Sequence, residues 1–190
     1  MAPNAGKVNN RWAWAAVLWG AAEASLFFIV PDVLISWVAL RRGWRAGVLA
    51  AVLATAGAAI GGSALYALSD RFPPSTWNAV SKVPAVSREM MEQAEADVMR
   101  DGWLVAAMKG PLTSTPYKVY AALAPRHGVS LPAWAAAAFP IRLPRFLLVV
   151  AGFALVGRIL DGRVSRRMLL GVFTLGWVMF YGWFWLSHPG

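Results

Sequence analysis

Four long apolar stretches alternate with shorter polar segments along the chain. They occupy residues 11–40, 46–68, 131–156 and 168–186. The stretches 46–68 and 168–186 contain no charged residue, and a helix needs about 20 apolar residues to cross a bilayer. Both therefore predict transmembrane helices. The stretch 131–156 predicts a third one if Arg142 and Arg145 face protein or water.

The first stretch, 11–40, is irregular because Pro31 and Asp32 interrupt it and because Glu23 lies inside it. The part that follows the break is too short to cross a bilayer as a helix. We favour a re-entrant hairpin whose tip is formed by Val30, Pro31 and Asp32. One kinked span is an alternative. A secretory signal peptide is a third, which Glu23 and the long apolar continuation disfavour.

A second broken segment, 102–124, contains two short apolar arms on either side of a tip that begins at Pro111 and ends at Pro116. Each half of the chain thus has a proline-interrupted segment followed by a full span. Interrupted segments in corresponding positions indicate a central binding site between two repeats. The pattern predicts an all-α integral membrane protein: an inverted repeat of two re-entrant hairpins, each followed by a transmembrane helix, and a final transmembrane helix.

The segment 70–101 between the halves predicts a helical connector outside the membrane, with a surface helix that begins near Ser87. No part of the chain is long enough to form a separate soluble domain, so residues 1–190 are expected to form a single membrane domain. Two clusters of arginine flank the apolar stretches and should be cytoplasmic. They consist of Arg41, Arg42 and Arg45, and of Arg158, Arg163, Arg166 and Arg167.

The composition supports a membrane environment. Hydrophobic residues make up 58% of the chain and charged residues 14%, whereas a soluble domain has roughly 25% charged residues. The net charge of +9 would suggest nucleic acid in a soluble protein, but here the basic residues lie mainly between apolar stretches and are better explained by orientation in a membrane. The absence of cysteine excludes disulfides, iron–sulfur clusters and thiol catalysis.

Charged residues inside apolar segments are costly and usually functional. In this chain they are Glu23, Asp32, Lys109, Lys118, Arg142 and Arg145. Bases outnumber acids in this set, which leaves a surplus of positive charge for an anion. The planar fork of arginine suits phosphate, and Thr115 and its neighbouring hydroxyls could donate further hydrogen bonds. The alternative is that these charges only pair with one another and hold the two halves together.

Glu23 is the strongest candidate for a proton carrier, whereas Asp32 either exchanges protons or caps a short helix. We expect no enzymatic activity, because neither histidine has a second histidine at metal-ligand spacing and because no nucleotide-binding loop or nucleophile elbow occurs. No metal or cofactor is expected.

Four motifs resemble the DedA superfamily (the VTT or SNARE-associated Golgi proteins), most closely its YqaA-like branch. They are the glutamate and proline-turn pattern at 20–34, Gly57-xxx-Gly61-Gly62-xxx-Tyr66, Thr115-Pro116-Tyr117-Lys118-Val119 and Arg142-xx-Arg145-Phe146. The resemblance implies two opposed re-entrant hairpins and movement of lipids between leaflets, dependent on proton motive force. It also implies functional roles for Glu23, Asp32, Arg142 and Arg145, with Lys118 at the hairpin tip.

The sequence thus predicts a multi-pass protein of the bacterial inner membrane that flips a phosphate-bearing lipid, such as a polyprenyl phosphate or a phospholipid. Arg142, Arg145, Lys118 and Thr115 would bind the phosphate, and Glu23 and Asp32 would couple protons. The expected partners are an anionic lipid and protons, not nucleic acid, and a homodimer is left open. Three alternatives are a proton-coupled carrier of a small ion, a non-transporting scaffold and a lipid-modifying enzyme.

Overall fold

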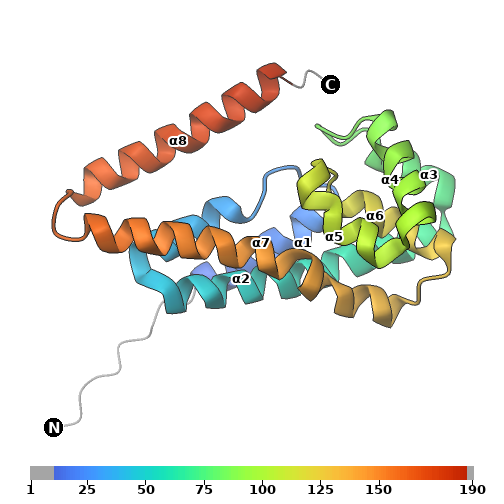
Figure 1. Ribbon diagram of the computed structural model, residues 1–190, viewed down its shortest axis with the longest axis horizontal. Coiled ribbons are helices and arrows are strands. Elements are labelled where there is room, and N and C mark those ends of the chain that lie inside the picture. Colours follow the sequence, from blue (N-terminus) through green and yellow to red (C-terminus); the bar gives the residue numbers. More distant parts are fainter. Residues whose placement is uncertain (1–10, 188–190) are drawn as a thin grey trace, which may run out of the picture.

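The computed structural model describes residues 11–187, and every regular element in that range is a helix. The elements are α1 (Arg11–Ser25), α2 (Asp32–Arg71), α3 (Pro73–Val80), α4 (Arg88–Asp101), α5 (Trp103–Thr113), α6 (Tyr117–Leu123), a 3-10 turn η1 (Ala124–His127), α7 (Leu131–Leu160) and α8 (Arg166–Ser187). Figure 1 shows α2 and α7 side by side along the long axis, with α3 to α6 gathered at one end.

The first broken segment consists of two helices joined by a turn. Helix α1 ends at Ser25, and α2 begins at Asp32 directly after Pro31. Pro31 has no backbone N–H to donate, and its fixed φ of −63° already suits the start of a helix. The chain turns back at this point (Figure 1). The turn therefore starts at residue 26, several residues before the tip that the sequence predicts.

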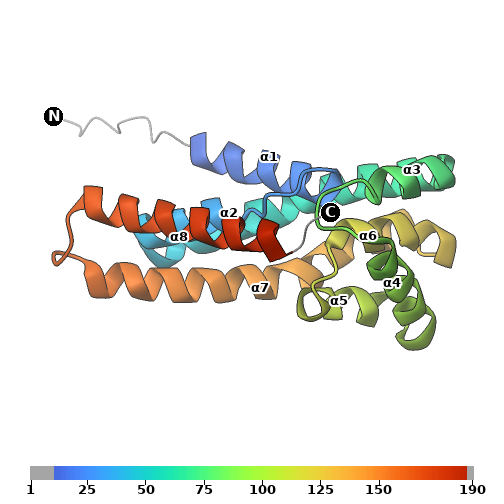
Figure 2. The same ribbon diagram turned by 90° about the horizontal axis from the view of Figure 1, so that it is seen from above.

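Helix α2 is two helices separated by a sharp bend at Gly43. This glycine has φ 78° and ψ −174°, a conformation that is open only to glycine. The bend returns the chain so that residues 44–71 run parallel to α1 (Figure 2). Residues 11–71 therefore make three passes, each antiparallel to the one before it.

Helices α1 and α2 approach so closely that their glycines contact the opposing backbone. A Cβ atom at Gly20 would collide with the carbonyl group of Ala54, and one at Gly57 would collide with that of Val17. Gly61 lies in the same way against Ala21. Small residues at this spacing permit close packing of helices in lipid, where dispersion forces replace the hydrophobic effect as the driving force.

Helix α7 covers the other side of α2. A Cβ atom at Gly47 would lie 2.8 Å from Val150 Cγ1, and Gly157 lies against the carbonyl group of Leu40. Helix α8 then diverges from the bundle (Figure 1). It is joined to α2 and α7 near its start, where the ring centroid of Phe173 lies 5.1 Å from that of Trp37.

The second broken segment consists of α5, a tip at residues 114–116 and α6. Both arms lie within the predicted segment 102–124. Ser114 adopts the left-handed conformation that ends α5, so Pro111, where the sequence placed the start of the tip, lies inside α5 instead. All residues of α6 are buried. The hydroxyl of Ser69 donates a hydrogen bond of 2.7 Å to the carbonyl of Ala122, which fastens α6 to the end of α2.

The connector contains the helix predicted from Ser87, whose hydroxyl accepts a hydrogen bond from Met90 N and so caps α4. It also contains α3, which the sequence analysis did not identify. Within residues 11–187, three helices are long and apolar enough to cross a membrane, judged by length and composition: Asp32–Arg71, Leu131–Leu160 and Arg167–Phe184. They cover the predicted stretches 46–68 and 131–156 in full and the stretch 168–186 as far as Phe184, and α2 also contains the bend and the second half of the first broken segment.

Candidate functional site

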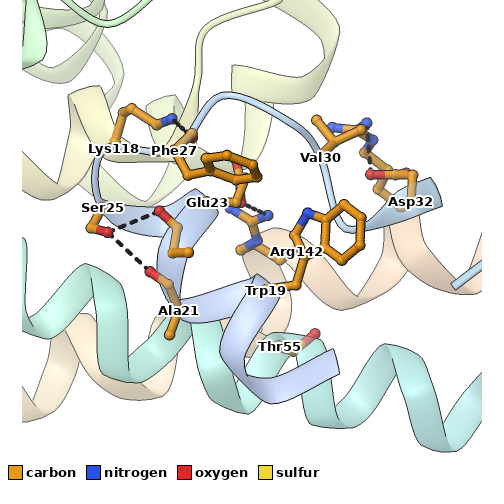
Figure 3. A network of polar contacts seen from close by, with 12 residues as sticks. Trp19, Ala21, Glu23, Ser25, Phe27, Val30, Asp32, Thr55, Lys118 and Arg142 are labelled. Atoms are coloured by element: carbon orange, nitrogen blue, oxygen red, sulfur yellow. Dashed lines mark hydrogen bonds and ion pairs between the residues drawn. The ribbon is translucent and has the colours of Figure 1, made fainter. Parts of the chain in front are cut away.

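A buried ion pair joins the first and second halves of the chain. Arg142 of α7 binds the carboxylate of Glu23 of α1, and each side chain is only 8% exposed (Figure 3). The guanidinium of Arg142 also lies over the rings of Tyr117 and Phe146, with its Cζ atom 5.1 Å and 5.2 Å from their centroids. Cation–π contacts of this kind compensate in part for the loss of water around a buried charge.

A second pair lies one helical turn further along α7. Arg145 Nη2 donates to Asp32 Oδ2 over 3.2 Å, and the arginine side chain is 46% exposed whereas the carboxylate is 4% exposed. Arg142 and Arg145 share a face because they are three residues apart in a helix. Their acids come from opposite sides of the first turn, so the two pairs hold α7 against both ends of this turn.

Lys118 connects the second broken segment to the first. Lys118 is only 2% exposed, and its Nζ atom donates a hydrogen bond of 2.6 Å to the carbonyl oxygen of Phe27 in the first turn (Figure 3). Thr115, at the adjacent tip, is also buried, and its hydroxyl lies 3.0 Å from that of Thr113. The two proline-interrupted segments therefore meet at their tips.

The charges at this site do not cancel. Glu23 and Asp32 each pair with an arginine, whereas the ammonium of Lys118 donates its hydrogen bond to the neutral backbone carbonyl of Phe27. Two acids and three bases leave a net charge of one positive unit. The Nε atom of Arg142 is buried and, among residues 11–187, has no hydrogen-bond partner.

Lys109, the remaining base that the sequence placed inside an apolar segment, lies elsewhere. Its ammonium is 2.8 Å from Asp101 at the end of α4, and its side chain is 51% exposed. Hydrogen bonds from Arg100 and Lys109 hold the pKa of Asp101 well below its usual range. Lys109 thus belongs to an exposed charge cluster and not to the site.

A cavity of about 560 Å³ opens beside the charged cluster. Its polar wall includes Glu23, Thr115, Lys118, Arg142 and Arg145. Its aromatic lining comes mainly from α8: Trp177, Phe180, Tyr181, Trp183 and Phe184. Five of the six residues predicted to form the site line this one cavity, and Asp32 is paired with one of them.

The sequence analysis missed the residues that hold the first turn. Trp19 Nε1 donates to the carbonyl of Ile29 over 2.8 Å, and the hydroxyl of Tyr181 accepts from Val30 N over 3.1 Å. Tyr117, stacked on Trp134 with centroids 4.9 Å apart, was also missed. Tyr181 could have been found from its spacing, because it follows Trp177 by four residues and both rings therefore lie on one face of α8.

No group of three or more His, Asp or Glu side chains placed to hold a metal ion occurs in the part of the chain that the structure describes. Comparison of the chain with protein-family models, with curated proteins and with solved structures finds no match. The function is therefore argued from the site itself.

Proposed function

We propose that this chain is a bacterial inner-membrane flippase that moves a phosphate-bearing lipid between leaflets, coupled to protons. Membership of the DedA superfamily, which the four motifs suggest, is part of the same proposal. The observation that carries it is the buried surplus cation: Lys118 lies in a cavity with two arginines, and both available acids are already paired.

The chemistry of the cavity favours phosphate over a neutral or cationic solute. Arg145 is half exposed and retains N–H groups beyond the one that binds Asp32, and Arg142 has an unpartnered Nε. Arginine binds phosphate through parallel hydrogen bonds, and lysine adds a point charge. A phosphate would enter among Lys118, Arg142 and Arg145, with the hydroxyl of Thr115 as a further donor.

The arrangement of the broken segments supports a re-entrant topology. Both arms of each segment are short, and the two turns meet through the bond between Lys118 and Phe27. Irregular backbone is tolerated at membrane depth only where it is buried in protein or lines a cavity. Both turns contribute to the cavity lining, the first through Phe28 and Val30 and the second through residues 114–116, although Leu26 and Phe27 are exposed. In this proposal the hairpins enter from opposite faces and their tips lie near the midplane.

Proton coupling would act through the two carboxylates. A proton on Glu23 removes the charge that holds Arg142, and a proton on Asp32 does the same for Arg145. Each protonation frees an arginine for phosphate, so proton binding and anion binding reinforce one another. This differential affinity is what a coupled transporter needs to change which side is open.

Transport is tested by leaflet accessibility of fluorescent lipids in proteoliposomes, with and without a pH gradient. Phosphate-bearing lipids should change leaflet faster than in empty vesicles, and Glu23→Gln should abolish the response to the gradient. If no labelled lipid moves faster than in empty vesicles, the proposed transport is wrong.

A matched pair of lysine variants makes this test specific to the site. Lys118→Gln should slow the movement at least about tenfold, because hydrogen bonds to a charged group contribute about 1.5–3 kcal/mol. Lys109→Gln removes an exposed lysine of the same charge and should leave the rate within about twofold, as expected for a surface ion pair. Equal effects of the two variants would contradict a role for Lys118.

A further inference from the structure

One face of α8 carries aromatic side chains at helical spacing. Phe173, Trp177, Tyr181 and Phe184 follow one another at intervals of three or four residues, and all four are partly covered. Residues on the remaining faces are exposed, for instance Val178 at 63%. The stripe is therefore the side of α8 that looks toward the rest of the protein.

The two ends of the stripe are held in different ways. At its start, Phe173 contacts the rings of Trp37 and Phe153, with centroids 5.1 Å and 6.1 Å away. Further along, the hydroxyl of Tyr181 accepts the hydrogen bond from Val30 N in the first turn. The part of α8 that lines the cavity begins at Trp177, between these two points, and continues past Tyr181 to Phe184.

The cavity is larger than its charged cluster requires. Its volume of about 560 Å³ is that of a site for a drug-sized molecule, since such pockets measure roughly 300–1,000 Å³. A phosphate group has four oxygens and displaces on the order of 100 Å³, if each oxygen is given about the 30 Å³ of a water. An inorganic anion at Lys118 and Arg142 would leave the aromatic wall uncovered.

We infer that the aromatic face of α8 is a subsite for the hydrocarbon chain of an amphiphile whose phosphate lies at the cationic wall. The inference rests on the proposed function and deepens it, because it adds where the hydrocarbon chain of the lipid phosphate lies. Trp177, Phe180, Tyr181 and Phe184 contact the chain next to the headgroup.

Two features make a hydrocarbon chain the appropriate occupant. The cationic and aromatic residues line one and the same cavity, so an amphiphile with a short distance between phosphate and chain can contact both at once. The aromatic rings offer large apolar surfaces, and burial of each CH₂ group against them strengthens binding by roughly fourfold, equivalent to about 0.8 kcal/mol.

The test measures how affinity depends on chain length at constant headgroup charge. Inorganic phosphate, ethyl phosphate and hexyl phosphate are titrated calorimetrically into the full-length protein in amphipol, where no detergent micelles compete, and hexanol serves as the uncharged control. Hexyl phosphate should bind at least about tenfold more tightly than ethyl phosphate, because four further CH₂ groups become buried. Hexanol should bind more weakly than hexyl phosphate by a similar factor.

Variants of α8 locate the chain. The double variant Trp177→Ala with Phe180→Ala should reduce the difference between hexyl and ethyl phosphate to about threefold or less. Met179→Ala is the matched control, because Met179 is on the same helix, is 65% exposed and does not line the cavity. This control should retain the full difference. Circular dichroism and size-exclusion profiles establish that both variants are folded.

The outcomes separate this inference from the proposed function. If both alkyl phosphates bind equally and lipid still moves in proteoliposomes, the chain subsite is wrong and the flippase proposal stands. If affinity rises with chain length in the unaltered protein and falls in the α8 double variant, but no lipid moves, the subsite is correct and transport is not. If neither phosphate binds at all, the chain subsite and the phosphate site among Lys118, Arg142 and Arg145 are both wrong, and lipid movement in proteoliposomes alone decides on transport.

Discussion

The Arg142–Glu23 and Arg145–Asp32 pairs share their chemistry but differ in exposure. The first pair is buried on both sides, whereas the arginine of the second is 46% exposed. Removal of one partner from a buried pair leaves an uncompensated charge, which is far more costly than the loss of an exposed pair. The Glu23 pair is therefore expected to matter both for stability and for transport.

A double-mutant cycle on this pair separates the two contributions. Glu23→Gln and Arg142→Gln should each destabilise the protein by about 3–5 kcal/mol, because each leaves the other charge buried. The combination of both should be less destabilising than the sum of the two, since no unpaired charge remains. The measurement is chemical unfolding in detergent followed by tryptophan fluorescence, and additive effects would contradict a direct pair.

At this scale the sequence predicted the charged residues of the site but not their aromatic neighbours. Glu23, Lys118 and Arg142 stand out because a charge in an apolar segment is unusual and costly. Tyr117 and Tyr181 do not stand out, because tyrosine near the end of a membrane helix is ordinary. The partner of each charge could not be predicted either, since pairing depends on how distant helices pack.

The packing of α1 against residues 44–71 depends on glycine at three positions. A Cβ atom at Gly57 would meet the backbone carbonyl of Val17, which cannot move aside as a flexible side chain could. A Cβ atom at Gly176 of α8, by contrast, would meet no atom within 4 Å. The two glycines are thus a natural pair for comparison, because both lie in apolar helices.

Gly57→Ala should destabilise the protein by about 1–3 kcal/mol through forced separation of α1 and α2. Gly176→Ala should instead be neutral or stabilise by up to about 1 kcal/mol, because alanine favours a helix and meets no obstacle. Thermal unfolding in detergent distinguishes the two, and a lower melting temperature for Gly176→Ala than for Gly57→Ala would overturn the close contact.

The bend at Gly43 is a second element-scale feature with a measurable cost. No atom lies within 4 Å of an added Cβ atom there, so the cost of Gly43→Ala comes from its φ of 78° alone. We expect a destabilisation of about 1–3 kcal/mol, with Gly152→Ala in α7 as a control that has equal space but ordinary helical geometry. A neutral Gly43→Ala variant would show that the bend is not required.

The sequence predicted where most helices lie, because long uncharged stretches have few other structures open to them in lipid. It separated the stretch 11–40 from 46–68, and the bend falls between them, but it predicted neither the left-handed glycine at this bend nor α3 after Phe72. Both follow from local backbone geometry: a glycine at positive φ and a pair of prolines that start a helix. Periodicity of apolar residues does not report on either.

For the whole molecule, the arginine clusters gather at one end. Arg41 and Arg158 line the same pocket with Gly43 and Asp161, which brings the bend of α2 beside the end of α7. Figure 1 shows α3 and α4 at the opposite end. Since positive charge favours the cytoplasmic side, α3 and α4 should face outward.

The chain has no cysteine, so single cysteines can report this orientation directly. Ser75→Cys in α3 should react with a membrane-impermeant maleimide on intact spheroplasts. Ser165→Cys in the loop before α8 should react only after permeabilisation. Both positions are exposed, so a reversed pattern would mean the opposite orientation, not poor access.

The partners at the centre of the fold are far apart in the order of synthesis. Glu23 is separated from Arg142 by 119 positions, and Phe27 from Lys118 by 91. While the chain is still emerging from the ribosome, the first segment therefore carries unneutralised carboxylates for as long as it takes to make the following hundred or so residues. Stable insertion of that early segment must wait for α7, which makes the nascent protein dependent on the insertion machinery and exposes truncated products to proteolysis.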